Sequence, residues 1–171
     1  MKSDRKEREY ASARKRAESH ENFERMNIKP PEGMPFFQPK KPGVYRLDIM
    51  PYVAGDGNPH AKPGQIWYER TFYVYPRIGP NNNTYCAPGK TFNKKDPIAE
   101  YRSKLQQEPD HDKDLVKKLW PKERQLFIVK DLSEPEKGYQ LWDVSYHLFG
   151  IHLDEKLKNC DPEDSESFDM F

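Results

Sequence analysis

The chain has few cysteines and no long apolar run, and each shortage excludes a class of protein. Its two cysteines, Cys86 and Cys160, cannot form a disulfide framework, so we expect reduced thiols in a cytosolic setting. The longest strongly apolar run, Leu126–Val129, is far too short for a transmembrane helix. The polar, charged N-terminus also lacks the pattern of a signal peptide, so we expect the protein to stay where it is made.

Net charge is nearly absent as well. The 29 Lys and Arg residues balance 28 Asp and Glu residues, so no strong overall field attracts nucleic acid. The charges are nevertheless unevenly placed: residues 1–29 contain nine basic and six acidic side chains, whereas residues 160–171 contain five acids and no base. We predict a polar basic arm at 1–29, helical or disordered, a folded domain at 36–158, and an acidic end at 159–171.

Sequence motifs of enzymes are missing too. No nucleophile elbow, P-loop or HExxH pattern occurs. Asp110, His111 and Asp112 lie together in a loop flanked by proline and lysine, which is typical of a solvated surface rather than of a catalytic cluster. We therefore expect no enzyme, no catalytic residue and no cofactor.

Strand patterns separated by turns account for most of the folded domain. Gly43–Tyr52 alternates apolar and polar residues, as a half-buried strand does, whereas Arg124–Leu132 has apolar residues on both faces, as a central strand does. Sixteen prolines favour long, pinned loops over a helical bundle. We predict a mainly β, α+β fold with strands at 43–52, 66–75, 124–132 and 139–144, helices at 97–107, 112–119 and 146–157, and a loop between Pro80 and Pro88.

The most informative segment is Trp67–Tyr75, where five aromatic rings fall in nine positions. Alternation predicts one face that packs in the core, formed by Ile66, Tyr68, Phe72 and Val74. It predicts a second face with almost no aliphatic residue, formed by Trp67, Thr71, Tyr73 and Tyr75. Because Arg70 and Arg77 accompany these rings, the second face is suited to stack on unpaired bases along a phosphate backbone. The alternative is that its rings pack beneath an insertion at about 80–120.

A second candidate site is the segment 90–104, which places lysine and arginine side chains beside Phe92 and Tyr101. Charge runs are usually solvated surfaces, but rings among the bases also fit a track for phosphates. These segments and basic residues near other strand ends give the predicted DNA-binding residues: Arg46, Trp67, Arg70, Tyr73, Tyr75, Arg77, Tyr85, Lys90, Phe92, Lys94, Lys95, Arg102, Lys122 and Arg124.

The order of several motifs resembles tailed-phage single-stranded DNA-binding proteins, which are related to the T-even-phage helix-destabilising protein. The motifs are GVYRLDI from Gly43, WYER from Trp67, IGPN from Ile78, DPIAEYR from Asp96, PKERQ from Pro121 and LWDVSY from Leu141. Together they span about residues 36–157. The resemblance implies an OB-type barrel with an inserted subdomain, and a role in protecting unpaired DNA during replication, recombination and repair.

In the resembling family the inserted subdomain is stabilised by zinc, and this chain departs from the pattern of ligands. Cys86 keeps the first cysteine position, whereas Asp96 and Ala99 stand at the next two. Structural zinc needs four donors, and alanine supplies none. Asp96 and His60 could in principle donate, but such a site would be weak. We therefore expect no metal and a loop held by the packing of Pro97, Ile98 and Tyr101.

The chain ends soon after the helix expected at 146–157, which leaves few residues for the strands that close an OB barrel. The resemblance implies either an incomplete barrel in a fragment, which the abrupt apolar stop at Met170 and Phe171 favours, or a barrel completed by other segments. Alternatively, an acidic tail that ends in phenylalanine is similar to the partner-binding tips of bacterial single-strand-binding proteins.

The resulting hypothesis is a sequence-independent single-stranded DNA-binding protein that coats unpaired DNA in the cytoplasm of a phage-infected bacterium. The resemblance implies self-association along DNA through the basic arm, and recruitment of phage replication proteins through the acidic end. The alternative is a protein-interaction or transcription-accessory module of a phage replisome, in which the same rings contact a protein. Binding of oligo-dT at low and high salt separates the two, because a phosphate-binding surface gives a steep salt dependence.

Overall fold

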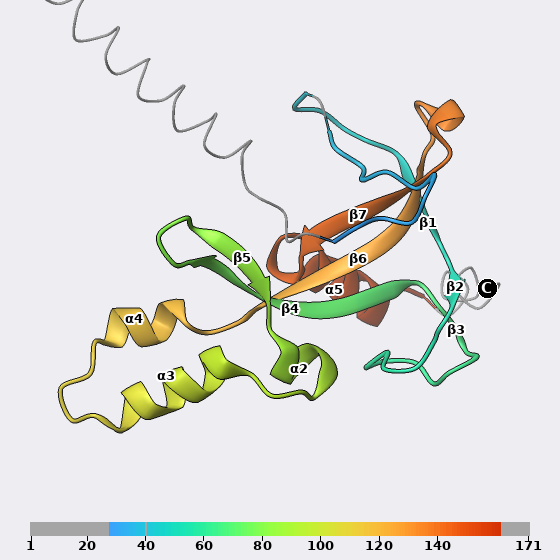
Figure 1. Cartoon of the computed structure of the whole chain (residues 1–171). Helices are drawn as coiled ribbons and strands as arrows, with labels where there is room; N and C mark the ends of the chain where they lie inside the picture. Colours follow the sequence, from blue (N-terminus) through green and yellow to red (C-terminus); the bar gives the residue numbers. More distant parts are fainter. Residues whose placement is uncertain (1–27, 40, 162–171) are drawn as a thin grey trace, which may run out of the picture.

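The computed structural model describes residues 28–39 and 41–161. Most of the predicted basic arm at 1–29 and of the acidic end at 159–171 lies outside these residues. The described part is an α+β fold, as predicted, in which short helices are attached to a mostly antiparallel sheet (Figure 1).

Strand β6 (Lys122–Asp131) is the centre of the sheet. One edge of β6 pairs antiparallel with β7 (Tyr139–Ser145). The other edge is shared by two strands in succession: β4 (Glu69–Ile78) pairs with residues 122–127, and β1 (Leu47–Met50) pairs with residues 128–131. The apolar residues on both faces of this segment predicted a central strand, and that prediction is confirmed.

The segments that contain β1 and β4 both leave the main sheet, and each segment is interrupted at the point where it leaves. Pro51, which has no N–H group to donate to a ladder, follows β1, and Tyr68 lies between β3 (Ile66–Trp67) and β4. Beyond these two residues, β2 (Tyr52–Val53) and β3 form a two-stranded ladder of their own (Figure 1). The strands predicted at 43–52 and 66–75 are therefore each divided in two.

β5 (Asn83–Cys86) returns along the second half of β4 and occupies the segment that was predicted to be a loop. The turn between them is made by Gly79 and Asn82, which both have positive φ angles, and the Asn82 N–H bonds to the Gly79 carbonyl at 3.2 Å. The asparagines that indicated a loop thus form the tip of a hairpin, because asparagine and glycine tolerate the left-handed backbone of such turns.

Three helices follow β5: α2 (Pro88–Phe92), α3 (Pro97–Gln107) and α4 (Lys113–Lys118). The side chains of Asp96 and Asp112 accept hydrogen bonds from backbone N–H groups in the first turns of α3 and α4. These caps satisfy donors that the helix itself leaves unpaired. The helix predicted at 97–107 is confirmed, and the helix predicted at 112–119 begins one residue later, with Asp112 as its cap.

The hydrophobic core lies on one face of β6 and β7. It is covered by η2 (Tyr146–Gly150), a π-helical turn, and by α5 (Ile151–Asn159); a short 3₁₀ helix, η1 (Pro135–Lys137), joins β6 to β7. Phe127 and Val129 of β6 are completely buried, and Phe149 and Leu153 pack against them. Phe37 completes this cluster from the N-terminal side. Full burial of each large side chain contributes about 1.5–3 kcal/mol.

The described strands do not close into a barrel, so the OB-type barrel stays a prediction. Within residues 28–39 and 41–161, no helix is both long and apolar enough to span a membrane. The α+β class is therefore established, whereas closure of the sheet is not.

Gly150, at the end of η2, is packed too closely for a larger residue. A Cβ atom there would lie 2.1 Å from Oε1 of Gln125, which is buried, and 2.5 Å from Cδ2 of Tyr146. We predict that Gly150→Ala lowers the free energy of unfolding by about 1–3 kcal/mol, the usual cost of overpacking. Urea denaturation measures the change. Gly43→Ala is the control, because its Cβ meets nothing within 4 Å; equal losses in both variants would contradict the close packing at Gly150.

Candidate nucleic-acid interface

The register of the sheet divides its side chains between two faces, because directly paired residues of antiparallel strands point to the same side. The core face carries Leu47, Ile49, Glu69, Thr71, Tyr73, Glu123, Gln125, Phe127, Val129, Asp131, Gln140, Trp142 and Val144. The opposite face, which we name the basic face, carries Asp48, Met50, Arg70, Phe72, Val74, Lys122, Arg124, Leu126, Ile128, Lys130, Tyr139, Leu141, Asp143 and Ser145.

The charges are segregated between these two faces. Among the paired residues, the basic face has four basic and two acidic side chains, whereas the core face has three acidic side chains and no basic one. Lys122 is exposed, and Arg70, Arg124 and Lys130 are half-buried. Of the apolar residues on this face, Met50, Leu126 and Ile128 are half-buried and Tyr139 is exposed, whereas Phe72, Val74 and Leu141 are buried. The basic face can therefore present positive charge and apolar surface to the same ligand.

Arg124 is positioned on this face by Asp143 of β7. Its Nε donates to Oδ1 of Asp143 at 2.6 Å, and its Nη2 donates to the Asp143 carbonyl at 3.3 Å. A guanidinium has five N–H donors, so two bonds to Asp143 fix its orientation and leave donors for a phosphate.

The insertion between β4 and β6 presents a second surface, in which cations lie close to aromatic rings. Lys90 Nζ is 4.8 Å from the centre of the Tyr73 ring, and Lys94 Nζ is 5.9 Å from that of Phe92. Phe92 is 54% exposed, and Lys90, Lys94 and Lys95 are exposed as well. Most of the predicted residues in 90–104 thus lie at the surface and can reach a ligand.

Arg102 is used inside the insertion instead. Its guanidinium carbon lies 3.9 Å from the centre of the Trp120 ring, and its Nη1 donates to the carbonyl of Leu119 at 3.3 Å. The side chain therefore attaches α3 to the end of α4. A direct phosphate contact, as predicted from the sequence, would compete with these two interactions.

Tyr75 is not available to stack on a base, contrary to the prediction. It is only 1% exposed, and its hydroxyl donates to Oδ2 of Asp96 at 2.9 Å. Asp96 also accepts from the backbone N–H groups of Gly89 and Ala99, both at 3.1 Å. One buried carboxylate thus joins β4 to the starts of α2 and α3, and this network explains the role of the aspartate that stands at a cysteine position of the resembling family.

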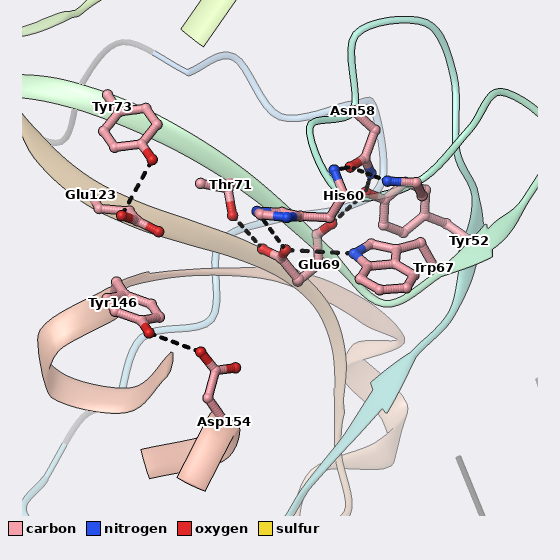
Figure 2. Close-up of polar contacts among 11 residues, drawn as sticks. Tyr52, Asn58, His60, Trp67, Glu69, Thr71, Tyr73, Glu123, Tyr146 and Asp154 are labelled. Atoms are coloured by element: carbon pink, nitrogen blue, oxygen red, sulfur yellow. Dashed lines mark hydrogen bonds and ion pairs between the residues drawn. The ribbon is translucent and has the colours of Figure 1, made fainter. Parts of the chain in front are cut away.

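Trp67 and Tyr73 lie on the acidic side of the sheet rather than beside Arg70. The Trp67 Nε1 contacts Oε1 of Glu69 at 3.5 Å, and the Tyr73 hydroxyl donates to Oε2 of Glu123 at 3.3 Å (Figure 2). Burial and the neighbouring Glu123 carboxylate raise the pKa of Tyr73. The sequence suggested that these rings and Arg70 act together, but the structure separates them, and carboxylates beside the rings disfavour phosphate.

The predicted residues Arg46, Arg77 and Tyr85 are exposed at the ends of strands. Arg46 directly precedes β1, and its carbonyl accepts the N–H of Leu132 at 3.0 Å. Arg77 lies in an irregular part of the β4–β5 ladder and has a positive φ angle of 58°. Tyr85 on β5 is 46% exposed. Each can reach solvent, but they do not form one cluster with the basic face.

The candidate zinc donors have other partners. Asp96 is held by the three hydrogen bonds described above, and Cys86 Sγ lies 3.7 Å from Oγ1 of Thr91. His60 Nε2 is 3.8 Å from Oε1 of Glu69, in a loop that Asn58 organises (Figure 2). Nowhere in the part of the chain that the structure describes do three His, Cys, Asp or Glu side chains form a group that could hold a metal ion.

Two residues were not among the predicted DNA-binding residues: Lys130, which lies on the basic face, and Tyr52, which lies next to that face. Lys130 follows Lys122 and Arg124 at an even spacing along β6, so alternation alone could have placed it on the same face. Tyr52 lies beside Arg70 because β2 leaves the main sheet after Pro51, and no signal in the sequence indicates that departure.

Comparisons with protein-family models, with curated proteins and with solved structures find no match to this chain. The resemblance to phage single-stranded DNA-binding proteins therefore stays an expectation based on motifs. Any functional proposal depends on the two surfaces described above.

The Tyr75–Asp96 bond predicts a specific pH dependence of stability. Burial and the hydrogen bond to Asp96 raise the pKa of Tyr75 to about 12. Stability from the neutral phenol is therefore complete below its ordinary pKa of about 10 and is lost as pH rises from about 10 to 12. We predict that Tyr75→Phe costs about 1.5–3 kcal/mol at neutral pH, and that this difference from the natural chain shrinks above pH 10.

Chemical denaturation at several pH values measures this difference. Tyr85→Phe is the matched control, because the hydroxyl of that tyrosine is at the surface and accepts from Asn83 Nδ2 at 3.2 Å. A Tyr75→Phe variant as stable as Tyr85→Phe at neutral pH would show that the buried bond contributes nothing.

Proposed function

We propose that this chain binds single-stranded DNA without recognising its base sequence, and that it coats unpaired DNA. The observation that carries the proposal is the segregation of charge across the sheet: basic side chains with apolar neighbours on the outward face, and acidic side chains on the core face. Single strands are usually bound by a positive groove that follows the phosphates together with apolar or aromatic surfaces that contact the bases.

In this proposal the single-stranded DNA crosses the basic face near β6 and then contacts the insertion. Lys122, Arg124 and Lys130 neutralise phosphates, while Leu126 and Ile128 contact bases. Lys122 begins β6 directly after the insertion. Because Lys90 of α2 contacts the ring of Tyr73 on the other side of β4, the DNA strand has to pass around the edge of the sheet to reach the cations of α2 and the following loop. Phe92 then offers a ring on which a base can stack.

The finer parts of the proposal follow the motif resemblance. The sheet is taken as an OB-type domain with an inserted subdomain, acting in phage replication, recombination and repair. The N-terminal arm is proposed to link neighbouring molecules along DNA, and the acidic C-terminal residues to recruit replication proteins. Both segments fall almost entirely outside the described residues.

The salt dependence of oligo-dT binding tests the basic face. Each phosphate neutralised on a single strand contributes a slope of about −0.7 in a plot of log K against log salt. We predict that the double change Lys122→Ala and Lys130→Ala weakens binding and makes the slope less steep by up to about 1.4. Fluorescence anisotropy at a series of salt concentrations measures both quantities.

The matched control removes two lysines from the other side of the molecule, with Lys156→Ala and Lys158→Ala on α5, which covers the core face. Equal changes of slope in both double variants would show that the effect comes from total charge and not from the basic face. Absence of salt-dependent binding in the natural chain would favour the alternative function, a protein-interaction module.

Phe92 tests the insertion. Loss of one stacked base costs about 1–3 kcal/mol, so Phe92→Ala should weaken oligo-dT binding by that amount without changing the salt slope. Leu148→Ala is the control, because Leu148 is also an exposed apolar residue, 77% exposed, but lies on η2 next to the core face. Unchanged affinity in folded Phe92→Ala would remove the insertion from the proposed interface.

A further inference from the structure

The basic face has cations and apolar surface, but stacking on a base also needs an aromatic ring that the base can reach. The aromatic residues at the paired positions of this face are Phe72 on β4 and Tyr139 at the start of β7. Phe72 is only 6% exposed, whereas Tyr139 is 49% exposed. Of these two rings, Tyr139 is therefore the one that a ligand in solution can contact.

Lys130 of β6 lies directly opposite Tyr139 in the register of β6 and β7. Directly paired residues on one face of antiparallel strands have Cβ atoms about 4.5–5.5 Å apart, so the lysine and the ring are neighbours. Within residues 28–39 and 41–161, neither side chain makes a hydrogen bond, an ion pair or a ring contact. Arg124, in contrast, is held by Asp143. The Lys130 and Tyr139 side chains are thus both free to contact a ligand.

One acidic residue adjoins this pair. Asp48 of β1 is exposed and lies opposite Lys130 on the other edge of β6. In the part of the chain that the structure describes, no ion pair joins these two side chains. Asp48 therefore does not occupy the ammonium group of Lys130, but its charge repels an anion that approaches the lysine, and salt screens this repulsion.

A tyrosine ring beside a lysine has the two features that bind one nucleotide. The ring can stack on any base, because every base has a π-face, and an ammonium group can neutralise a phosphate. A protein partner is less suitable, because lysine is depleted in protein–protein interfaces. Lys122 and Arg124 lie on the same face, so positive charge continues along β6. Lys130 is six residues from Arg124, or about 20 Å at the usual rise of a strand.

We infer that Tyr139 stacks on one base of the bound single strand and that Lys130 neutralises the phosphate next to that base. The inference rests on the proposed function, and it places one end of the DNA path at the start of β7. Tyr139 supplies an aromatic surface to the basic face, whereas Trp67 and Tyr73 lie on the acidic side of the sheet.

The experiment compares the affinity of the full chain for oligo-dT and for an abasic oligonucleotide of the same length, at a low salt concentration. Loss of one stacked base weakens binding about tenfold, the equivalent of about 1.4 kcal/mol. Tyr139→Ala should therefore weaken oligo-dT binding about tenfold and leave the abasic affinity unchanged. Tyr139→Phe keeps the ring and should bind both oligonucleotides like the natural chain. Lys130→Ala should weaken both by the same factor, because both oligonucleotides carry phosphates.

Asp48→Asn tests the same pair in the opposite direction. Removal of the carboxylate should tighten the binding of both oligonucleotides at low salt by up to about fivefold, the equivalent of about 1 kcal/mol for an exposed charge pair. The gain should shrink as salt is added.

The control variant is Leu148→Ala, which removes an exposed apolar side chain next to the core face and should change neither affinity. Circular dichroism and the melting temperature identify folded variants. If alanine destabilises β7, Tyr139→Thr replaces Tyr139→Ala, because threonine also lacks the ring but favours strands.

The results that would overturn the inference separate it from the proposed function. If the folded Tyr139 variants without a ring bind oligo-dT like the natural chain, or if Tyr139→Phe loses as much affinity as they do, no base stacks on this ring while DNA binding stands. If Lys130→Ala and Asp48→Asn change neither affinity, the phosphate lies elsewhere, and again DNA binding stands. If the natural chain binds neither oligonucleotide, the proposed function fails together with the inference.

Discussion

The shared edge of β6 is the constraint on which the rest of this structure depends. β4 and β1 pair with successive halves of that edge, so the two strands must separate beside Phe127 and Ile128. On the core face, the junction is filled by the completely buried ring of Phe127 and its aromatic neighbours. On the basic face, the same junction leaves a hollow lined by Arg70. One strand with three neighbours therefore determines both the packed side of the sheet and the side proposed to bind DNA.

The acidic and basic side chains of the sheet differ in their hydrogen-bond partners. Glu69 accepts from Thr71 at 2.8 Å, Glu123 accepts from Tyr73, and Asp131 accepts the backbone N–H of Ser133 at 2.8 Å. These acids are held by donors within the protein, on or beside the core face. On the opposite face, Arg124 is held by Asp143 and Nη1 of Arg70 is shielded from solvent, whereas the ammonium groups of Lys122 and Lys130 can reach water or a phosphate. A chain with a net charge of only +1 can thus present one positive surface.

Much of the secondary structure could be predicted, because its signals are local. Asp96 and Asp112 mark the starts of α3 and α4, and the apolar residues on both faces of β6 mark a central strand. The candidate site was harder to predict. Face assignment along 66–75 assumed one continuous strand, but the chain is interrupted at Tyr68, whose ring lies 6.4 Å from that of Phe127 in the core. Alternation cannot be carried across such an interruption, so Tyr68 and Phe72 point to different faces.

The sequence by itself determined the α+β class, the order of the main elements and the neighbouring rings and cations of the insertion, because capping, alternation and turn chemistry act between residues close in the chain. Only the tertiary structure decided which rings are accessible. Tyr75 is buried and bonded to Asp96, which lies 21 residues further on in the chain, and Nη1 of Arg70 is buried without a hydrogen-bond partner. Burial and hydrogen-bond satisfaction depend on contacts between distant segments, and no local pattern contains them.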